Sequence, residues 1–584
     1  MRTLSLLMLF GLLASAQEYK PGPDSLPQPG VPVGKVTKHV LAPGKYYPGT
    51  PHNYQVYVPA QYDASKPTPF MIYLDGGGAV GNGMRVPTVF DNLIAKKDIP
   101  PMIGIFIDPG VLPVVNPEAM NRFERVFEYD SLSDRFASFL IDEVIPEVSK
   151  SYNLSKDPND RGLSGNSTGA VGAFMAAWNR PDQFRRVLSF IGTFVSMKGA
   201  DAMPALIRKT EPKPIRVHLQ AGKNDHLAAD LPFGTFYAGS WPVNNQVMFE
   251  ALSYSGYDVK FELGNGGHDG KQTAAIMPDA LRWLWRGYPA PITVKEPAHM
   301  KAPGYDPRGK VYSMISAAKQ WELVADNAAA PAPDSQGNIY FFDFKASQIK
   351  KTDGVGNTTV FKNNIRANSM ATGPDGRIYV ATDQNKIIAL DSAGNEKPVA
   401  SGIHVTGMAI AQNGRIYTTD AAAKLIQSVE PGGKVQNLSR ADEFGTPFGI
   451  TLSPDQAMAV VTDVQGRFSW SFQIAKDGKL VNGEPFYRLE LPEAGDKSGV
   501  SATAVDNIGQ VYFATLARIQ VCEANGRVAA ILNSPDRNRM SYLTFGGKDM
   551  NFLYVVDNFK LYRREMKVSG AGSWMTLKLP KPPL

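Results

Sequence analysis

The sequence predicts two domains of different fold class: an α/β domain with a mostly parallel sheet and helices on both faces, then an all-β propeller of six blades. Between residues 35 and 287, short apolar runs alternate with helical patterns, which is typical of a parallel sheet. Within residues 311–584, a turn followed by a strand recurs roughly every 40 residues, the period of propeller blades. Residues 288–310 are rich in Pro, Gly and Lys and are predicted to be the linker.

The chain begins with a segment typical of an export signal. Residues 1–16 combine one arginine, an apolar core and the small-residue ending Ala-Ser-Ala, so cleavage is expected after Ala16. A proline-rich segment, residues 17–34, follows. The apolar run is too short to span a bilayer, and no later run is a candidate. We therefore expect a secreted or periplasmic protein with no membrane partner.

The composition indicates which partners to expect and what stabilises the fold. The formal net charge is only +6, with acidic and basic residues interspersed, so no nucleic-acid partner is expected. The single cysteine, Cys522, lies in an apolar run and is predicted to be buried in a strand. Because no disulfide can form within the chain, stability must come from packing. None of these patterns predicts the oligomeric state.

In the first domain, the spacing of apolar residues predicts the strands and helices. Buried strands are predicted at 69–74, 102–107 and 215–219. A helix is predicted over 136–148, where apolar residues recur at helical spacing. A shorter helix is predicted over 278–285, with its proline in the first turn.

The most informative motif is Gly-Asn-Ser-Thr-Gly at 165–169, a G-x-S-x-G pattern that precedes a run of small residues. In this motif the serine occupies a cramped turn between a strand and a helix, where glycine on either side avoids a Cβ clash. The helix behind the turn directs backbone N–H groups at the site. The motif predicts that Ser167 is a nucleophile, whereas Ser164 is predicted to lie on the strand that enters the turn.

A serine nucleophile needs an imidazole base, and the base needs a carboxylate that orients it. Hydrolases with such a sheet supply these groups in the chain order serine, acid, histidine. His268, in a glycine-rich loop after a strand pattern, is the predicted base, and Asp225, after the strand at 215–219, is the predicted acid. The alternatives are His226 for the base and Asp230, Asp258 and Asp269 for the acid.

Two further features are predicted around the nucleophile. The oxyanion hole should use the backbone N–H of Thr168 together with one from the glycine run Gly76, Gly77 and Gly78, which follows a predicted strand. The sequence does not distinguish among the three glycines. Trp241 lies between the acid and the base in the chain and is predicted to contact the substrate.

Four motifs of the first domain together resemble the esterase group that includes enterochelin esterases, esterase D and the feruloyl and acetyl-xylan carbohydrate esterases. They are Tyr-Leu-Asp-Gly-Gly-Gly at 73–78, Phe-Glu-Tyr-Asp at 127–130, the G-x-S-x-G motif with Arg-Pro-Asp-Gln-Phe at 180–184, and Gly-Gly-His at 266–268. The resemblance covers most of residues 35–285. It implies an α/β-hydrolase fold, no cofactor, and the assignment of Ser167, Asp225 and His268 as the triad.

In the second domain, repeated sequence units predict the fold. Each unit combines turn residues with an apolar strand, and six units predict six blades. The clear copies are 334–343, 374–382 and 412–420, and the weaker ones are 453–463, 506–515 and 546–557.

This half resembles the gluconolactonase/SMP-30 propeller family, through Ala-Asn-Ser-Met at 367–370 with Gly-Pro-Asp-Gly at 373–376, the run 449–455, and 545–549 with Leu-Tyr at 553–554. Active members of that family hold a divalent metal through Glu, Asn and Asp side chains. Local alignment places Ala329, Phe448 and Ser501 at those positions, and Asn368 alone cannot hold a metal. The side chains of Ala and Phe offer no oxygen donor. We therefore expect no metal site and a propeller that no longer hydrolyses lactones.

Together these observations predict a secreted serine carboxylic-ester hydrolase that needs no cofactor. Its expected partner is an ester substrate, such as an acetyl or feruloyl ester carried on a polysaccharide, or a siderophore ester. The propeller is expected to bind or to be structural. Two alternatives stay open: a metal-dependent lactonase that uses the propeller, and a glycan- or protein-binding module without catalysis.

Overall fold

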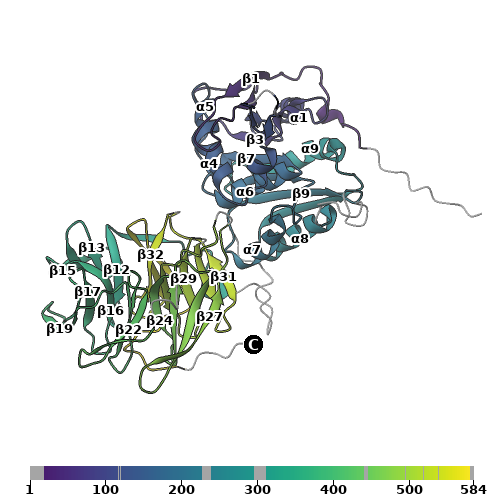
Figure 1. Cartoon of the computed structure of the whole chain (residues 1–584). Coiled ribbons are helices and arrows are strands. Elements are labelled where there is room, and N and C mark those ends of the chain that lie inside the picture. Colours follow the sequence, from purple (N-terminus) through teal and green to yellow (C-terminus); the bar gives the residue numbers. More distant parts are fainter. Residues whose placement is uncertain are drawn as a thin grey trace, which may run out of the picture. The chain divides into compact units, whose positions relative to one another are not determined.

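The computed structural model describes residues 19–115, 118, 120–225, 239–294, 311–439, 445–492, 495–516, 518–536 and 538–578. The predicted signal segment 1–16 therefore lies outside the described residues, as does most of the predicted linker. Contacts within the chain divide it into two compact units (Figure 1). Unit 1 is Met1–Ala205 with Lys213–Val294, and unit 2 is Leu206–Pro212 with Lys295–Leu584.

Unit 1 is built on one eight-stranded sheet. Its first two strands pair antiparallel at one edge, and the remaining six strands run parallel to one another. The spatial order is β1 (Lys35–Leu41), β2 (His52–Val58), β4 (Ile103–Ile107), β3 (Phe70–Leu74), β7 (Arg161–Asn166), β8 (Arg186–Phe190), β9 (Arg216–Gly222) and β10 (Asp258–Gly264).

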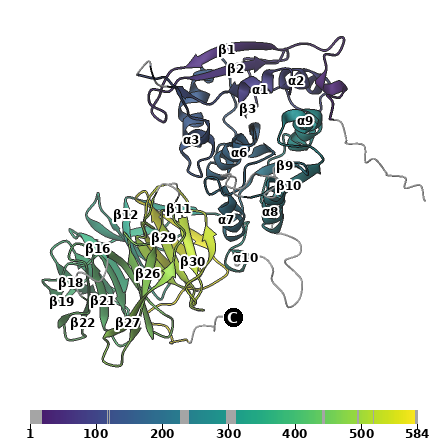
Figure 2. The ribbon, with the colours of Figure 1, turned by 45° about the vertical axis from the view of Figure 1, so that its right-hand side comes forward.

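Helices cover both faces of this sheet (Figures 1 and 2). On one face, α2 (Val86–Ala95) and α9 (Gly270–Trp285) share a buried apolar cluster with Met71 and Tyr73 of β3. On the other face, α6 (Thr168–Asn179) packs against Leu74 of the same strand. Neighbouring side chains of a strand point to opposite faces, which is why the continuous apolar run of β3 serves two layers. The predicted α/β-hydrolase class is confirmed.

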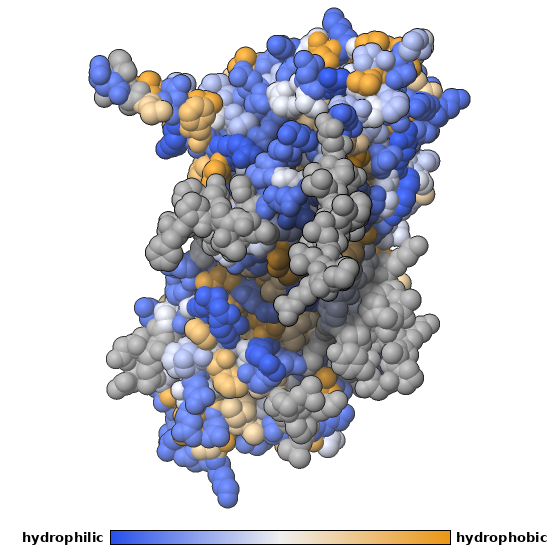
Figure 3. Space-filling model, turned by 90° about the vertical axis from the view of Figure 1, so that its right-hand side faces the viewer, coloured by the Kyte–Doolittle hydropathy of each residue, from blue (hydrophilic) through white to orange (hydrophobic). Residues whose placement is uncertain are grey.

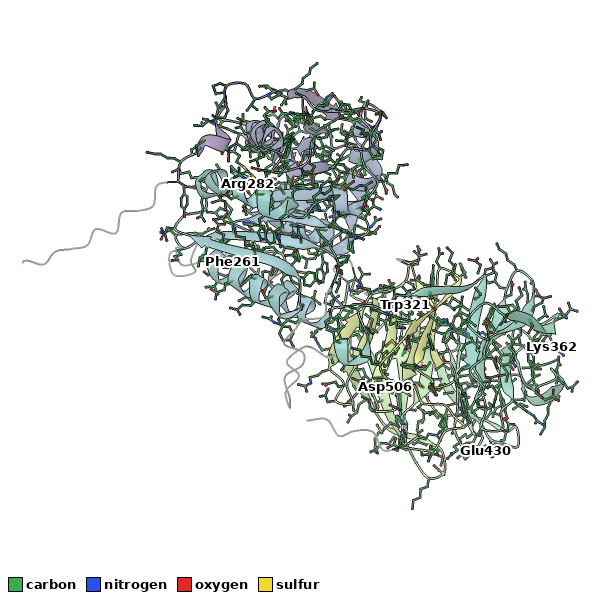
Figure 4. All side chains as sticks on the ribbon, turned by 180° about the vertical axis from the view of Figure 1, so that it is seen from behind. Phe261, Arg282, Trp321, Lys362, Glu430 and Asp506 are labelled. Atoms are coloured by element: carbon green, nitrogen blue, oxygen red, sulfur yellow. The ribbon has the colours of Figure 1, made fainter. Side chains whose placement is uncertain are left out.

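The helix predicted over 278–285 begins earlier than expected. α9 starts at Gly270, where the Asp269 side chain accepts a hydrogen bond from Lys271 N at 3.0 Å and caps the helix. Pro278 therefore lies inside the helix, at the cost of one backbone hydrogen bond. Arg282, farther along α9 (Figure 4), forms ion pairs with three aspartates, at 2.6 to 2.9 Å.

The helix predicted over 136–148 is present as a continuous helical stretch with a π-helical turn at Leu140–Val144. At the far edge of the sheet, Phe261 of β10 (Figure 4) stacks on Phe249 of the helix α8 (Trp241–Tyr254), with ring centroids 5.5 Å apart. The other helices and short strands of unit 1 are α1 (Gly76–Val80), α3 (Arg125–Tyr129), α4 (Arg135–Phe139), α5 (Ile145–Ser149), β5 (Val111–Leu112) and β6 (Arg122–Phe123), with 3-10 turns at Pro23–Ser25, Pro158–Asp160 and Ala200–Ala202. The helix α7 (Met203–Lys209) begins in unit 1 and ends in unit 2, and α10 (Val311–Met314) belongs to unit 2.

Unit 2 contains six four-stranded antiparallel sheets, so the predicted six-bladed propeller is confirmed. The last blade is completed by the first strand of the domain, which pairs with the last strand and closes the ring. In order, the blades are β12 (Ala328–Pro333), β13 (Ile339–Asp343), β14 (Gln348–Thr352), β15 (Thr358–Asn363); β16 (Ala367–Thr372), β17 (Ile378–Thr382), β18 (Lys386–Leu390), β19 (Glu396–Ser401); β20 (Gly407–Ile410), β21 (Ile416–Asp420), β22 (Leu425–Val429), β23 (Val435–Asn437); β24 (Pro447–Leu452), β25 (Met458–Asp463), β26 (Phe468–Ile474), β27 (Leu480–Arg488); β28 (Ala502–Val505), β29 (Val511–Thr515), β30 (Arg518–Cys522), β31 (Val528–Leu532); and β32 (Met540–Gly546), β33 (Phe552–Asp557), β34 (Lys560–Glu565) with β11 (Glu322–Asp326).

Each of the six sequence repeats supplies the second strand of a blade and the turn before it. In the first repeat, one carboxylate oxygen of Asp334 accepts hydrogen bonds from the backbone N–H groups of Gln336 and Asn338, both at 2.9 Å. Gly337 takes the left-handed conformation that closes the turn, with φ at 95°. Asp506, in the equivalent turn of the fifth blade (Figure 4), is buried and accepts from Gln510.

Leu206–Pro212 belongs to unit 2 although it comes between β8 and β9 in the chain. Within unit 2, Glu211 accepts two hydrogen bonds from the Arg564 guanidinium, at 2.7 and 2.8 Å, and both side chains are buried. Thr210 forms a parallel β-bridge with Ile531. This bidentate ion pair compensates the buried charge of Arg564, which has no access to water.

The surface of the chain is mixed in character. The face seen in Figure 3 is mostly hydrophilic, with hydrophobic residues in scattered patches. Cys522 is buried in β30. Among the helices of the described ranges, none combines the length and the apolar content needed to cross a membrane.

Candidate active site

A group of polar side chains lies where parallel strands of unit 1 end. Ser167 directly follows β7, Thr193 follows β8, Asp225 follows β9 and His268 follows β10, while Gly76 comes just after β3. The carboxyl ends of parallel strands meet at one edge of a sheet, so residues that are distant in the sequence become neighbours there.

Ser167 occupies a strained turn between β7 and α6. Its backbone has φ 58° and ψ −123°, a conformation rarely taken by a residue with a side chain. A Cβ at Gly165 would lie 2.1 Å from Gly169 O, so only glycine fits there. At Gly169 a Cβ would come within 3.1 Å of the Asp75 carboxylate, which is tight rather than impossible. The turn therefore depends most on the first of the two motif glycines.

The three residues predicted as a triad form a hydrogen-bonded chain. His268 Nε2 lies 2.9 Å from Ser167 Oγ, and His268 Nδ1 lies 2.8 Å from an Asp225 carboxylate oxygen. The Asp225 side chain is fully buried, whereas 22% of the His268 side chain is exposed. A base within reach of the hydroxyl and a carboxylate behind the base is the geometry that nucleophilic serine requires.

Backbone contacts join the loop of the acid to the loop of the histidine. Lys223 N donates to Gly264 O at 2.8 Å, and Asn224 N donates to Gly266 O at 3.0 Å. A Cβ at Gly222 would lie 2.0 Å from Gly266 O, so the two loops can approach only because this residue is glycine. The parallel pairing of β9 with β10 thus continues past the strand ends and places Asp225 beside His268.

The sequence alternatives occupy other positions. Asp258 begins β10, at the opposite end of that strand from His268, and forms an ion pair with Arg216 at 2.6 Å. Asp269 caps α9. Ser164 is buried within β7, as predicted for the strand residue. His226 and Asp230 lie outside the described residues.

The glycine run after β3 forms the start of the short helix α1. Gly77 N donates to Asp108 at 2.8 Å, and Gly78 N donates to Asp75 O at 3.0 Å, so both of these N–H groups are engaged. Gly76 and Thr168 occupy the first positions of α1 and α6, where an N–H has no acceptor within its own helix. These two N–H groups are the candidates for an oxyanion hole.

Arg125, which no sequence motif predicted as a site residue, connects the two helix starts. Its guanidinium donates to both oxygens of Asp75 at 2.7 Å, to Asn166 O at 3.2 Å and to the Thr168 hydroxyl. Burial alone would lower the pKa of Arg125, but hydrogen bonds with Asp75 and its charge outweigh burial and raise that pKa. The cation therefore holds the residue before α1 against the residues around the start of α6.

Thr193 is a second site residue that no sequence motif predicted. Its hydroxyl lies 3.0 Å from Ser167 Oγ and accepts from Trp241 Nε1 at 3.3 Å. Trp241 is 2% exposed and its ring meets His268 edge-on, with centroids 5.5 Å apart. A direct contact between Trp241 and substrate stays a prediction, because the contacts described for this side chain are with the site residues themselves. Polar residues that follow parallel strands lie close together at one edge of a sheet. If the strand at 186–190 had been predicted, this pattern would have indicated Thr193.

In unit 2, the innermost strands of the blades enclose a cavity of about 200 Å³. Phe448 and Ser501 line it, and Ala330, next to Ala329, lies on its wall. The lining residues include no charged side chain and no histidine, so the cavity does not fit a divalent cation held by carboxylates. Elsewhere in the described ranges, no group of three or more His, Cys, Asp or Glu side chains could hold a metal ion.

Two family models match the chain. Residues 47–284 match the family described as “Putative esterase”, and residues 330–557 match the SMP-30/Gluconolactonase/LRE-like region. The chain joins an esterase-family domain to an SMP-30/gluconolactonase-like region. All the strand-end residues of the site lie within residues 47–284, the part of the chain that matches the esterase family.

Individual relatives cover only part of the chain. The iron(III) enterobactin esterase of Dickeya dadantii (strain 3937) is 28% identical over 161 residues, which are 25% of this chain and 34% of that protein. The match thus spans about a third of that relative's length. A solved ferulic acid esterase covers 44% of this chain and 99% of its own, at 17% identity and a TM-score of 0.33. A gluconolactonase from Xanthomonas campestris covers 42% and 90%, at 17% identity and a TM-score of 0.37.

Proposed function

We propose that the chain is an exported serine carboxylic-ester hydrolase in which Ser167, His268 and Asp225 act as the catalytic triad. The observation that carries this proposal is the chain of hydrogen bonds from Ser167 Oγ to His268 at 2.9 Å and from His268 to Asp225 at 2.8 Å. The match of residues 47–284 to an esterase family supports the same chemistry. Export, to the periplasm or out of the cell, is proposed from the signal-like residues 1–16.

In the first half of the reaction, Ser167 Oγ attacks the ester carbonyl carbon and His268 Nε2 takes the hydroxyl proton. The carbonyl oxygen becomes negative and accepts hydrogen bonds from the N–H groups of Thr168 and Gly76. Asp225 stabilises the imidazolium through Nδ1. The intermediate then collapses: the bond to the alcohol oxygen breaks, that oxygen takes the proton from His268, and the acyl group stays on Ser167.

In the second half, His268 removes a proton from water as the water oxygen attacks the acyl carbon. The same two N–H groups receive the oxyanion. When the intermediate collapses, the bond from the acyl carbon to Ser167 Oγ breaks and Oγ recovers a proton from His268. The carboxylic acid leaves, and the free enzyme is restored without a cofactor.

For the substrate, we propose an acetyl or feruloyl ester of a carbohydrate, with a siderophore ester as the competing choice. The family likeness supports both. An apolar acyl group would find apolar surface on α3, where Val126 and Phe127 follow Arg125 and are 45% and 43% exposed. A panel of acetyl, feruloyl, siderophore and simple lactone esters separates the choices by their kcat/KM.

For the propeller, we propose a structural or binding role. The uncharged lining of its central cavity supports such a role and argues against the hypothesis of a metal-dependent lactonase. The hydrogen-bonded chain of Ser167, His268 and Asp225 argues against the hypothesis that the protein only binds a ligand, because packing alone does not require this geometry.

The test is hydrolysis of p-nitrophenyl acetate by the full chain with Ser167→Ala. We expect kcat to fall by at least about 1000-fold, as loss of a nucleophile does in comparable enzymes. Ser164→Ala is the matched control, because it removes a hydroxyl that is three positions earlier and buried in β7. Equal rates for the wild type and Ser167→Ala would overturn the proposal.

A further inference from the structure

Thr193 lies in a strained and firmly held loop behind the nucleophile. Ile191, two residues earlier, has φ 43°, which is unfavourable for a β-branched side chain. The loop is secured by Asn245 of α8, whose amide donates to Gly192 O at 2.8 Å, and by Thr193 N, which donates to Ser167 O at 3.2 Å. Thr193 itself is 1% exposed. Strain that is maintained beside a reacting group points to a function for the group it positions.

The directions of the hydrogen bonds around Thr193 follow from which atoms can donate. An indole N–H only donates, so Thr193 Oγ1 accepts from Trp241. Neutral His268 that donates from Nδ1 to Asp225 must accept at Nε2, which takes the proton of Ser167. The remaining contact, 3.0 Å between the two hydroxyls, is then made by the Thr193 O–H donating to Ser167 Oγ. The chain of donors runs in one direction from Trp241 through Thr193 and Ser167 to His268.

We propose that Thr193 is a catalytic hydrogen-bond donor to Ser167 Oγ, held in that orientation by Trp241. This inference rests on the proposed function. Ser167 Oγ is neutral in the free enzyme and in the acyl-enzyme, and it carries partial negative charge while its bond to the acyl carbon forms or breaks. A hydrogen bond to a charged acceptor is stronger than one to a neutral acceptor. The Thr193 O–H therefore stabilises both transition states more than the states before them, which is the condition for catalysis.

No bond of Thr193 is made or broken in this scheme. In the attack step, the Ser167 proton moves to His268 and the Thr193 proton stays on Oγ1, closer to the developing charge. In acyl-enzyme breakdown, His268 returns a proton to Ser167 Oγ, and Thr193 supports the leaving oxygen until that transfer is complete. The indole N–H of Trp241 occupies one lone pair of Thr193 and so keeps its hydrogen aimed at Ser167.

The test compares Thr193→Val, which keeps the shape and removes the hydroxyl, with Thr193→Ser, which keeps the hydroxyl. We expect Thr193→Val to lower kcat by about 10- to 100-fold with KM changed less than about 3-fold, the size seen when one donor to a charged group is lost. Thr193→Ser should regain most of kcat. Stopped-flow measurement of phosphonate inactivation follows the attack step alone and should slow by a similar factor in Thr193→Val.

Trp241→Phe gives a second route if Thr193→Val does not fold, because it leaves the hydroxyl in place but frees its direction. Its kcat should fall by a smaller factor, about 3- to 10-fold. In a Ser167→Ala background, Thr193→Val should cause no further loss. A Thr193→Val enzyme with at least half of the wild-type kcat, while Ser167→Ala is inactive, would overturn this inference and leave the proposed function standing. If Ser167→Ala keeps full activity, the proposed function fails and the inference fails with it.

Discussion

At the scale of single residues, the site depends on side chains that act through others. Arg125 touches neither Ser167 nor His268 in the described contacts, yet it binds Asp75, Asn166 and Thr168 together. Because Asp75 precedes Gly76 and Thr168 follows Ser167, this one guanidinium sets the distance between the two N–H groups proposed for the oxyanion hole. Its planar, two-pronged pairing with Asp75 is a geometry that a lysine cannot reproduce.

Arg125→Lys therefore tests positioning at constant charge. We expect kcat on p-nitrophenyl acetate to fall by about 10- to 100-fold with little change in KM, since small shifts of a catalytic group have effects of that size. The matched control is Arg122→Lys in the same segment, whose partner is Glu124 and whose side chain is 69% exposed. Equal kcat values for the two variants would show that Arg125 does not position the helix starts.

At the scale of elements, strand ends and their glycines decide where the side chains meet. β9 and β10 remain paired beyond their last residues, because Lys223 and Asn224 continue to donate to the loop that carries His268. Gly222 allows this approach, while Gly165 allows the turn at Ser167. The two glycines are needed for close contact between backbones rather than for flexibility.

We predict that Gly222→Ala lowers the free energy of unfolding by about 1–3 kcal/mol, the usual result of adding a methyl group where there is no space. It should also reduce kcat strongly, because the loops of Asp225 and His268 must move apart. Urea unfolding and ester hydrolysis measure the two effects. Gly270→Ala is the control: a Cβ there meets nothing within 4 Å, so stability should change by less than about 0.5 kcal/mol. A Gly222→Ala protein as stable as this control would contradict the argument.

At the scale of the whole molecule, the division into units does not follow the order of the chain. Leu206–Pro212 belongs to unit 2, so a cut in the predicted linker at 288–310 would remove this segment from the propeller. Arg564, which is fully buried, would then lose Glu211 as its counter-charge. A buried charge without its partner is strongly destabilising, which makes the full chain the appropriate protein for experiments on the propeller.

Glu211→Gln in the full chain isolates that effect. We expect the unfolding free energy of unit 2 to fall by about 3–5 kcal/mol, because the Arg564 charge stays buried without compensation. Lys209→Gln, which breaks the partly exposed pair with Glu490, should cost less than about 1 kcal/mol. Calorimetry can separate the units, since a phosphonate on Ser167 should raise only the transition of unit 1. Similar losses in the two variants would contradict a buried pair as the cause.

The sequence determined the fold class of each half, because periodic apolar runs and repeated turn chemistry are local properties that a chain carries wherever it folds. It also singled out Ser167, Asp225 and His268 by motif and chain order, and their catalytic roles stay predictions. Only the tertiary structure decided the start of α9, the hydrogen bonds that engage the N–H groups of Gly77 and Gly78, and the presence of Thr193 and Arg125 at the site. These features depend on which strands lie side by side in the sheet. Neighbouring strands can come from distant parts of the sequence, so a local sequence pattern does not reveal which residues meet at their ends.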